Sequence, residues 1–246
     1  MKKLRFIHAA DLHLDSPFRG LAQTSPRLRD LLHSATFQAL DRIVGHAIGS
    51  KSDFVLLVGD LYDSSDRSLR VLVEFRRQME RLAEHDIGAY VVHGNHDPLN
   101  GWGSEFKMPP NVFVFDGEVR EQSVIRQGRE LARVSGISYT QERVTENLAK
   151  SFKPALNGVY SIAMLHANIG RQTGHADYAP APVTDLTDSG FDYWALGHVH
   201  TCAVLILRAG HCVSGQPPGA PRAGNRPQRL LSGGCRYERS KPFEIY

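Results

Sequence analysis

The chain has 246 residues, of which 41% are hydrophobic, and it carries a formal net charge of +3. This length suits one sizeable α/β domain or two small ones, and the composition is ordinary for a globular protein, so a disordered chain is not the default expectation. The small net charge does not by itself indicate a nucleic-acid partner. No apolar run reaches 18 residues and no signal-peptide core begins the chain, so we expect no membrane span. Three cysteines without a paired spacing favour free thiols in the cytoplasm.

Short apolar runs and longer amphipathic stretches alternate along the first hundred residues. Runs of four to six β-branched and apolar residues bounded by Gly, Asp or Asn predict buried strands. Apolar residues spaced three and four apart predict helices over residues 26–48 and 66–86. The buried strands are expected at residues 4–8, 54–58, 89–92, 160–165 and 193–196.

The middle of the chain shows a different pattern. Apolar runs at 112–115, 119–125 and 131–137 follow one another without long helices between them, which favours antiparallel or mixed pairing. The whole pattern predicts a layered α/β domain whose polar loops lie at the carboxyl ends of strands.

Five polar blocks stand where the predicted buried strands end. Carboxylate and imidazole ligands in this order are typical of a two-metal hydrolytic centre, in which one group bridges two cations roughly 3.5–4 Å apart. The blocks are Asp11-Leu-His13, Gly59-Asp60-Leu-Tyr-Asp63, Gly94-Asn95-His96-Asp97, the single His166, and Gly197-His198-Val-His200. The candidate metal ligands are Asp11, His13, Asp60, Asn95, His166, His198 and His200.

Two residues of these blocks are better suited to acid–base work than to metal binding. His96 follows the candidate ligand Asn95 and is expected to point towards the phosphate, where an imidazolium can protonate the leaving oxygen. Asp63 is a plausible partner that fixes the tautomer of His96, although a turn carboxylate is an alternative. The amide ligand Asn95 favours oxygen-preferring ions such as Mn²⁺, Mg²⁺ or Fe²⁺.

Two further groups allow a substrate contact or a plain structural reading. Arg171, His175 and Tyr178 lie in a Gly-rich segment after His166 and are candidates for binding substrate phosphate or sugar. An arginine run within 67–81 could meet a nucleic-acid backbone, but a solvated helix face is the preferred interpretation.

Five stretches carry a family resemblance: FIHAADLHLDSPFRGL (6–21), LLVGDLYD (56–63), VVHGNHDP (91–98), TGHADYAP (173–180) and YWALGHVHT (193–201). With these stretches the sequence resembles the calcineurin-like metallophosphoesterases, and among them the SbcD-type DNA-repair exonucleases of the YhaO-like branch. The metal blocks are common to the superfamily, whereas the first and fourth stretches also carry narrower motifs. The resemblance covers residues 1 to about 205.

The resemblance implies a fold, a ligand set and partners. The fold is a four-layer αββα sandwich with mixed sheets, and His96 is its catalytic histidine. The activity is cleavage of DNA phosphodiesters with two Mn²⁺ ions, in partnership with an SMC-like, SbcC-type ATPase and as a possible homodimer. One metal is held by Asp11, His13, Asp60 and His200, and the other by Asp60, Asn95, His166 and His198.

The end of the chain departs from the family. Family members continue into a cap that holds DNA and a segment that docks the ATPase, so we expect residues 1–207 to form the nuclease domain of a C-terminally truncated subunit. Residues 208–246 are rich in Gly and Pro, with seven basic and two acidic residues and no strand pattern before Phe243. We interpret them as an atypical tail and hypothesise a frameshift between roughly residues 204 and 211, which an intact reading frame on resequencing would contradict.

Three functional readings follow. The leading one is a two-metal-dependent DNA exonuclease or endonuclease subunit in DNA repair. The second is a metallophosphoesterase acting on a small-molecule or nucleotide phosphoester, because the metal ligands are the same in both cases. The third is an inactive truncated remnant.

Overall fold

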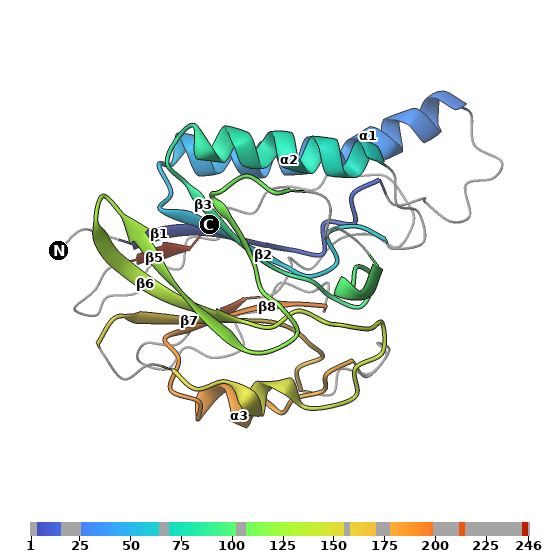
Figure 1. Ribbon diagram of the computed structural model, residues 1–246. Helices are drawn as coiled ribbons and strands as arrows, with labels where there is room; N and C mark the ends of the chain where they lie inside the picture. Colours follow the sequence, from blue (N-terminus) through green and yellow to red (C-terminus); the bar gives the residue numbers. More distant parts are fainter. Residues whose placement is uncertain are drawn as a thin grey trace.

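The structure, a computed structural model, describes residues 4–15, 26–63, 69–101, 107–154, 158–170, 178–198, 212–214 and 243–245; for 26–33, 101 and the last two ranges it describes the backbone alone. Two five-stranded sheets face each other (Figure 1). The first has the order β10-β1-β2-β3-β4, and every described pair in it is parallel. Its strands are β1 (Leu4–Ala10), β2 (Phe54–Val58), β3 (Gly88–Val92), β4 (Val112–Val114) and β10 (Phe243–Ile245).

The second sheet has the order β5-β6-β7-β8-β9 and is mixed. Only the β5–β6 hairpin is antiparallel in it, and the other described pairs are parallel. The predicted antiparallel or mixed pairing in the middle of the chain is thus present as a mixed sheet, in which this hairpin is the antiparallel pair among the described strands. The strands are β5 (Arg120–Arg126), β6 (Arg129–Gly136), β7 (Tyr160–His166), β8 (Tyr193–Gly197) and β9 (Cys212–Ser214).

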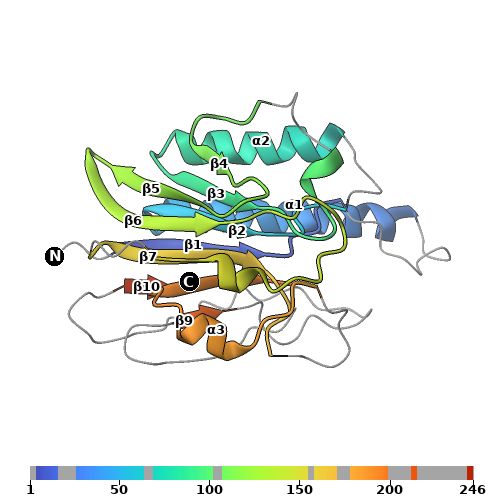
Figure 2. The ribbon, with the colours of Figure 1, turned by 60° about the horizontal axis from the view of Figure 1, so that its bottom comes forward.

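Helices complete the layers on both sides. α1 (Pro26–Gly49) and α2 (Leu69–Ala83) cover the outer face of the first sheet, and the short α3 (Val183–Thr187) lies outside the second (Figures 1 and 2). This arrangement confirms the four-layer αββα prediction. None of the helices in the described part of the chain is both long and apolar enough to cross a membrane.

Strand β2 shows why the buried strands have continuous apolar sequences. Phe54, Leu56 and Val58 pack between the two sheets, whereas Val55 and Leu57 pack beneath the helices. Because successive side chains of a strand point to opposite faces, a strand covered on both sides needs apolar residues at every position. A third apolar cluster fills the space between the second sheet and α3.

The strands that carry the polar blocks end at one edge of the sandwich. Asp11 follows β1 of the first sheet and His198 follows β8 of the second, yet the His198 backbone N–H donates to the Asp11 carboxylate at 3.0 Å. The carboxyl ends of both sheets therefore meet, and the polar blocks meet with them.

The described residues from 208 onward form two three-residue strands. β10 pairs with β1 through Phe243, where the sequence pattern resumes, but β9 pairs with β8 where no strand pattern was predicted. Three residues are too few to show an alternation, so β9 has no recognisable sequence signal. The division of the chain at residue 207 stays a prediction.

Candidate metal centre

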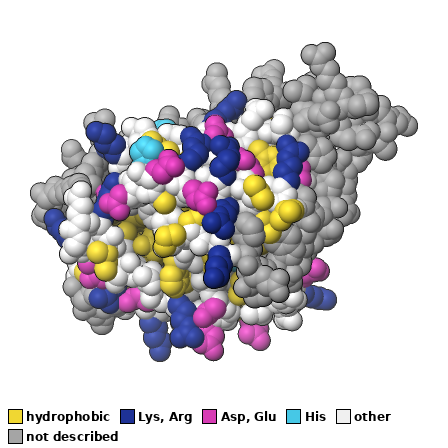
Figure 3. Space-filling view, turned by 45° about the horizontal axis from the view of Figure 1, so that its top comes forward, with side chains coloured by type: hydrophobic (Ala, Val, Ile, Leu, Met, Phe, Trp, Pro, Cys, Tyr) yellow, Lys and Arg dark blue, Asp and Glu magenta, His cyan; other side chains and the backbone are white. Residues whose placement is uncertain are grey.

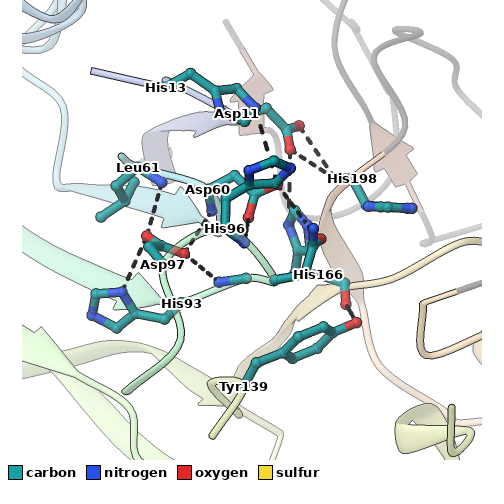
Figure 4. Close-up of polar contacts among 12 residues, drawn as sticks. Asp11, His13, Asp60, Leu61, His93, His96, Asp97, Tyr139, His166 and His198 are labelled. Carbon is teal, nitrogen blue, oxygen red and sulfur yellow. Dashed lines mark hydrogen bonds and ion pairs between the residues drawn. The ribbon is translucent and has the colours of Figure 1, made fainter. Parts of the chain in front are cut away.

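The described metal-ligand candidates gather at the common edge of the sheets. Asp60 follows β2 and His166 is the last residue of β7 (Figure 4). Asn95 follows β3, so that both sheets supply donors. Five of the donors are buried, and His13 is partly buried. The residues brought together are Asp11, His13, Asp60, Asn95, His166 and His198.

Asp60 lies at the centre of this group. Its Oδ2 atom is 3.3 Å from Nε2 of His166 and 4.0 Å from Nε2 of His13. Two sets of donor atoms, one from Asp11, His13 and Asp60 and one from Asp60, His166 and His198, each lie within 4.8 Å of one another. Asp60 belongs to both sets, which is the position of a carboxylate that bridges two cations.

The spacing of the donor atoms fits metal ligation. Ligand bonds of about 2.1 Å place neighbouring donors about 3.0–3.4 Å apart in octahedral or tetrahedral geometry. Nε2 of His166 lies 3.1 Å from Oδ1 of Asn95 and 3.3 Å from Oδ2 of Asp60. In the described part of the chain, Nδ1 of this fully buried imidazole has no hydrogen-bond partner. The residues present therefore fit a divalent cation.

The charges around His166 act on its protonation. Burial opposes a charged imidazole, but the negative charge of Asp60, its hydrogen bond and the charge of Asp11 outweigh burial and raise the His166 pKa to about 9. The partner carboxylate shows the complementary effect: burial opposes its charge, yet His166 lowers the pKa of Asp60. Without metal, the centre is therefore expected to hold a proton on His166 at neutral pH.

Metal binding should accordingly depend on pH. Because a ligand imidazole must be neutral, Mn²⁺ has to displace the His166 proton below pH about 9, so affinity should rise with pH and level off above that value. Release of one proton corresponds to ~10-fold in affinity per pH unit. Calorimetric Mn²⁺ titrations at pH 7 and pH 8, in buffers of different ionisation enthalpy, measure both the change and the proton released. An affinity that does not change with pH would contradict this account of His166.

The backbone is strained where the ligands leave their strands. Asp11, His13, Asp60 and His198 have φ values of 53°, 41°, 49° and 89°, in the left-handed region that side-chain-bearing residues rarely adopt. Each such residue is disfavoured by about 1 kcal/mol or more, and clustering of this strain is a feature of functional sites. Hydrogen bonds hold the turns, including the His13 N–H donating to the Asp60 carbonyl at 2.9 Å.

Three glycines leave room for the His166 ring. A Cβ atom added at Gly59 would lie 2.1 Å from Nδ1 of His166, and one at Gly197 would lie 2.7 Å from the same atom. At Gly94 a Cβ would lie 2.4 Å from Oδ1 of Asp60 and 2.9 Å from the His166 ring. The backbone thus passes close to the His166 ring at all three glycines, which we call the glycine cage.

His96 and Asp63 form a pair beside the buried donors. Nδ1 of His96 lies 2.8 Å from Oδ1 of Asp63, and 51% of the His96 side chain is exposed. The hydrogen bond to Asp63 raises the pKa of His96, and the charge of Asp60 adds to this effect. Asp63 also lies 3.2 Å from Nδ1 of the ligand candidate His13, a contact that sequence reasoning missed. One carboxylate therefore orients both imidazoles.

Comparison with known proteins agrees with this geometry. Residues 4–202 match the calcineurin-like phosphoesterase family. The chain belongs to this family. Its members are metal-dependent phosphoesterases, in keeping with the donor groups described above.

Individual relatives also match most of the chain. The chain is 40% identical over 203 residues to YhaO of Bacillus subtilis, named an uncharacterized metallophosphoesterase, covering 82% of this chain and 50% of that protein. It is 25% identical over 219 residues to the DNA double-strand break repair protein Mre11 of Sulfurisphaera tokodaii, covering 87% and 53%. The chain thus spans about half the length of the curated relatives it matches. A dimetal phosphatase structure from Danio rerio matches with a TM-score of 0.47 at 11% identity, covering 86% of this chain and 87% of that one.

Among the candidate substrate-binding residues of this phosphoesterase, Tyr178 lies at the metal centre. Its ring is 5.4 Å from the ring of His198, in an edge-on arrangement. The Asn168 N–H donates to the Tyr178 carbonyl at 2.9 Å and so holds this segment beside the end of β7. Arg171, His175 and the ligand candidate His200 lie outside the described residues.

The arginines of α2 do not form an isolated positive surface. Arg76 pairs with Glu80, Arg77 with Glu74, and Arg81 with Asp41 of α1, at 2.6–2.8 Å. Figure 3 shows basic and acidic side chains interspersed over this face. The contacts favour the solvated helix face over a nucleic-acid contact.

Two buried residues that support this phosphoesterase centre were not predicted. The hydroxyl of Tyr139 donates to the His166 carbonyl at 2.5 Å, and Asp97 binds the loops that carry Asp60 and Asn95. Asp97 belongs to one of the predicted polar blocks, and this position could have indicated that it lies at the site. Its burial and its hydrogen-bond partners could not be read from the sequence. Tyr139 lies in no block and had no signal.

Proposed function

We propose that the chain is a two-metal phosphodiester hydrolase that acts on DNA as the nuclease subunit of a repair complex. The observation that carries the proposal is the Asp60 carboxylate, shared by two sets of metal donors, with the exposed His96 imidazole beside it. We assign one metal to Asp11, His13, Asp60 and His200, and the other to Asp60, Asn95, His166 and His198. The carboxylate and amide oxygens suit Mn²⁺.

The roles of the side chains follow from their contacts. Bound metals would supply Lewis-acid charge for the phosphoryl oxygens and lower the pKa of an attacking water. His96 keeps Nδ1 against Asp63, which leaves Nε2 as the nitrogen that can protonate the leaving oxygen. Tyr178, beside His198, would contact the substrate, as would Arg171 and His175.

The choice of DNA is supported by relatives named as Mre11 DNA double-strand break repair proteins. An SbcC-type ATPase partner, a homodimer and a cytoplasmic location belong to the same proposal. A small-molecule or nucleotide phosphoester is the second candidate, because the most identical relative reported above is named only as a metallophosphoesterase.

A substrate comparison tests the proposal. We expect the purified chain with Mn²⁺ to degrade end-labelled linear duplex DNA, and EDTA or His96→Ala to stop it. Hydrolysis of bis(p-nitrophenyl) phosphate without DNA degradation would favour the small-molecule candidate. A folded chain that binds Mn²⁺ and hydrolyses neither substrate would support the inactive remnant.

A further inference from the structure

Asp97 is buried between the loops that follow β2 and β3, with 1% of its surface exposed. Its Oδ1 atom accepts hydrogen bonds from the backbone N–H groups of Asp60 at 3.0 Å and Gly94 at 2.7 Å. Its Oδ2 atom accepts from the Leu61 N–H at 2.9 Å and lies 3.1 Å from Nδ1 of His93 (Figure 4). Four donors therefore converge on one carboxylate.

A further hydrogen bond between the two loops has its acceptor carboxylate in the loop after β2. Oδ1 of Asp60 accepts the backbone N–H of His96 at 2.9 Å. Each loop thus offers a carboxylate that accepts amide hydrogens of the other loop. Hydrogen bonds to a charged acceptor are about twice as strong as neutral ones, so the two loops are held in one relative position.

This exchange determines which way Asp60 faces. With Oδ1 held by the His96 amide, Oδ2 is the atom that lies towards Nε2 of His166 and Nε2 of His13. The Asp97 bonds to the amides of Asp60 and Leu61 hold the main chain from which this carboxylate extends. The bond to Gly94 does the same for the turn that carries Asn95.

We propose that Asp97 is a positioning residue for the metal centre: its carboxylate binds the two loops together and so places the bridging Asp60 and the ligand Asn95. Both Asp97 oxygens are already occupied by two donors each, so the residue acts through the ligands rather than as one. The inference rests on the metal centre of the proposed function but not on DNA as substrate.

Asp97→Asn tests this role, with Asp53→Asn as a matched control. An amide at 97 retains one acceptor oxygen and presents its NH₂ group to two of the four donors, so the loops separate. Asp53 is also buried, accepts the Arg5 N–H at 2.9 Å and pairs with Arg126, but it precedes β2 whereas Asp60 follows it. At about 3.3 Å per residue along this strand, Asp53 and Asp60 are roughly 20 Å apart, so Asp53 is remote from the metal centre.

The readout is calorimetric titration of the metal-free full chain with Mn²⁺, beside its thermal unfolding midpoint. Both variants should lower the midpoint, but only Asp97→Asn should weaken Mn²⁺ binding, by about 10–100-fold, the range for residues that orient metal ligands. Equal Mn²⁺ affinity in both variants would overturn the proposal.

A milder variant decides the matter if Asp97→Asn does not fold. His93→Phe removes one donor from the Asp97 carboxylate and leaves the loop amides intact. It should weaken Mn²⁺ binding about fivefold, the change that corresponds to one hydrogen bond. Unchanged affinity in a folded His93→Phe chain would count against the proposal. Because the readout is metal binding, it is independent of the substrate. A parent chain that binds Mn²⁺ normally yet leaves DNA intact would contradict the proposal that DNA is the substrate, and not the role of Asp97.

Discussion

Gly59→Ala is expected to abolish activity by displacing His166 from the metal centre. The added methyl group would lie 2.1 Å from Nδ1 of His166. Because this separation is far below van der Waals contact, the buried imidazole ring has to move. The backbone at Gly94 and Gly197 also lies close to this ring, so the ring cannot shift without changing its distances to the donors of Asp60 and Asn95. A displacement of about 1 Å lowers catalysis by about 100-fold, and loss of a ligand lowers it further.

Gly128→Ala is the control for backbone strain. Gly59 and Gly128 have nearly equal φ values, 68° and 72°, but a Cβ at Gly128, in the β5–β6 turn, would meet nothing within 4 Å. Both variants incur about 1–2 kcal/mol for the left-handed backbone, and only Gly59→Ala adds the clash. Mn²⁺ titration and bis(p-nitrophenyl) phosphate hydrolysis of both variants separate the effects. Normal Mn²⁺ affinity in Gly59→Ala would show that the cage does not hold His166 in place.

His96→Ala should lower kcat by about 10²–10⁴-fold while Mn²⁺ affinity stays unchanged, the range lost when a general acid is removed. The alanine keeps the backbone N–H that donates to Asp60, so the bridging carboxylate retains its orientation. Half of the His96 side chain is already exposed, and its removal leaves little empty space.

The control for this prediction is His85→Ala. His85 is an exposed histidine just beyond α2, with Nδ1 against the Arg81 carbonyl, and it should retain full activity. Steady-state hydrolysis of bis(p-nitrophenyl) phosphate at saturating Mn²⁺ gives kcat for both variants. A His96→Ala chain with the kcat of the parent would remove His96 from the proposed chemistry.

The sequence predicts the buried strands well because burial on both faces forces continuous apolar runs, as in β2 and β7. The predicted helices at 26–48 and 66–86 correspond to α1 and α2; α2 ends at Ala83 rather than 86, and residues 66–68 lie outside the described residues. The five-residue α3 was not predicted, because one turn and a half is too short for a helical period to show.

The sequence predicted the ligand candidates of the site that directly follow buried strands. Parallel strands bring their carboxyl ends to one edge, so the described ligand candidates meet as expected. The contacts that orient them depend on tertiary positions: Tyr139 reaches His166 from the loop after β6, and Asp63 reaches His13 across a separation of 50 residues. No local pattern encodes such distances.

The hydrogen bond between Asp11 and His198, 187 residues apart, has a consequence for biosynthesis. The first sheet supplies Asp60 and Asn95, but His166 and His198 come from strands made much later. A nascent chain that has formed only β1 to β4 of the first sheet holds an incomplete donor set, and contacts of such long sequence separation form slowly. We therefore expect metal loading to be a late step of folding, so that the emerging polypeptide stays catalytically silent until both halves have docked.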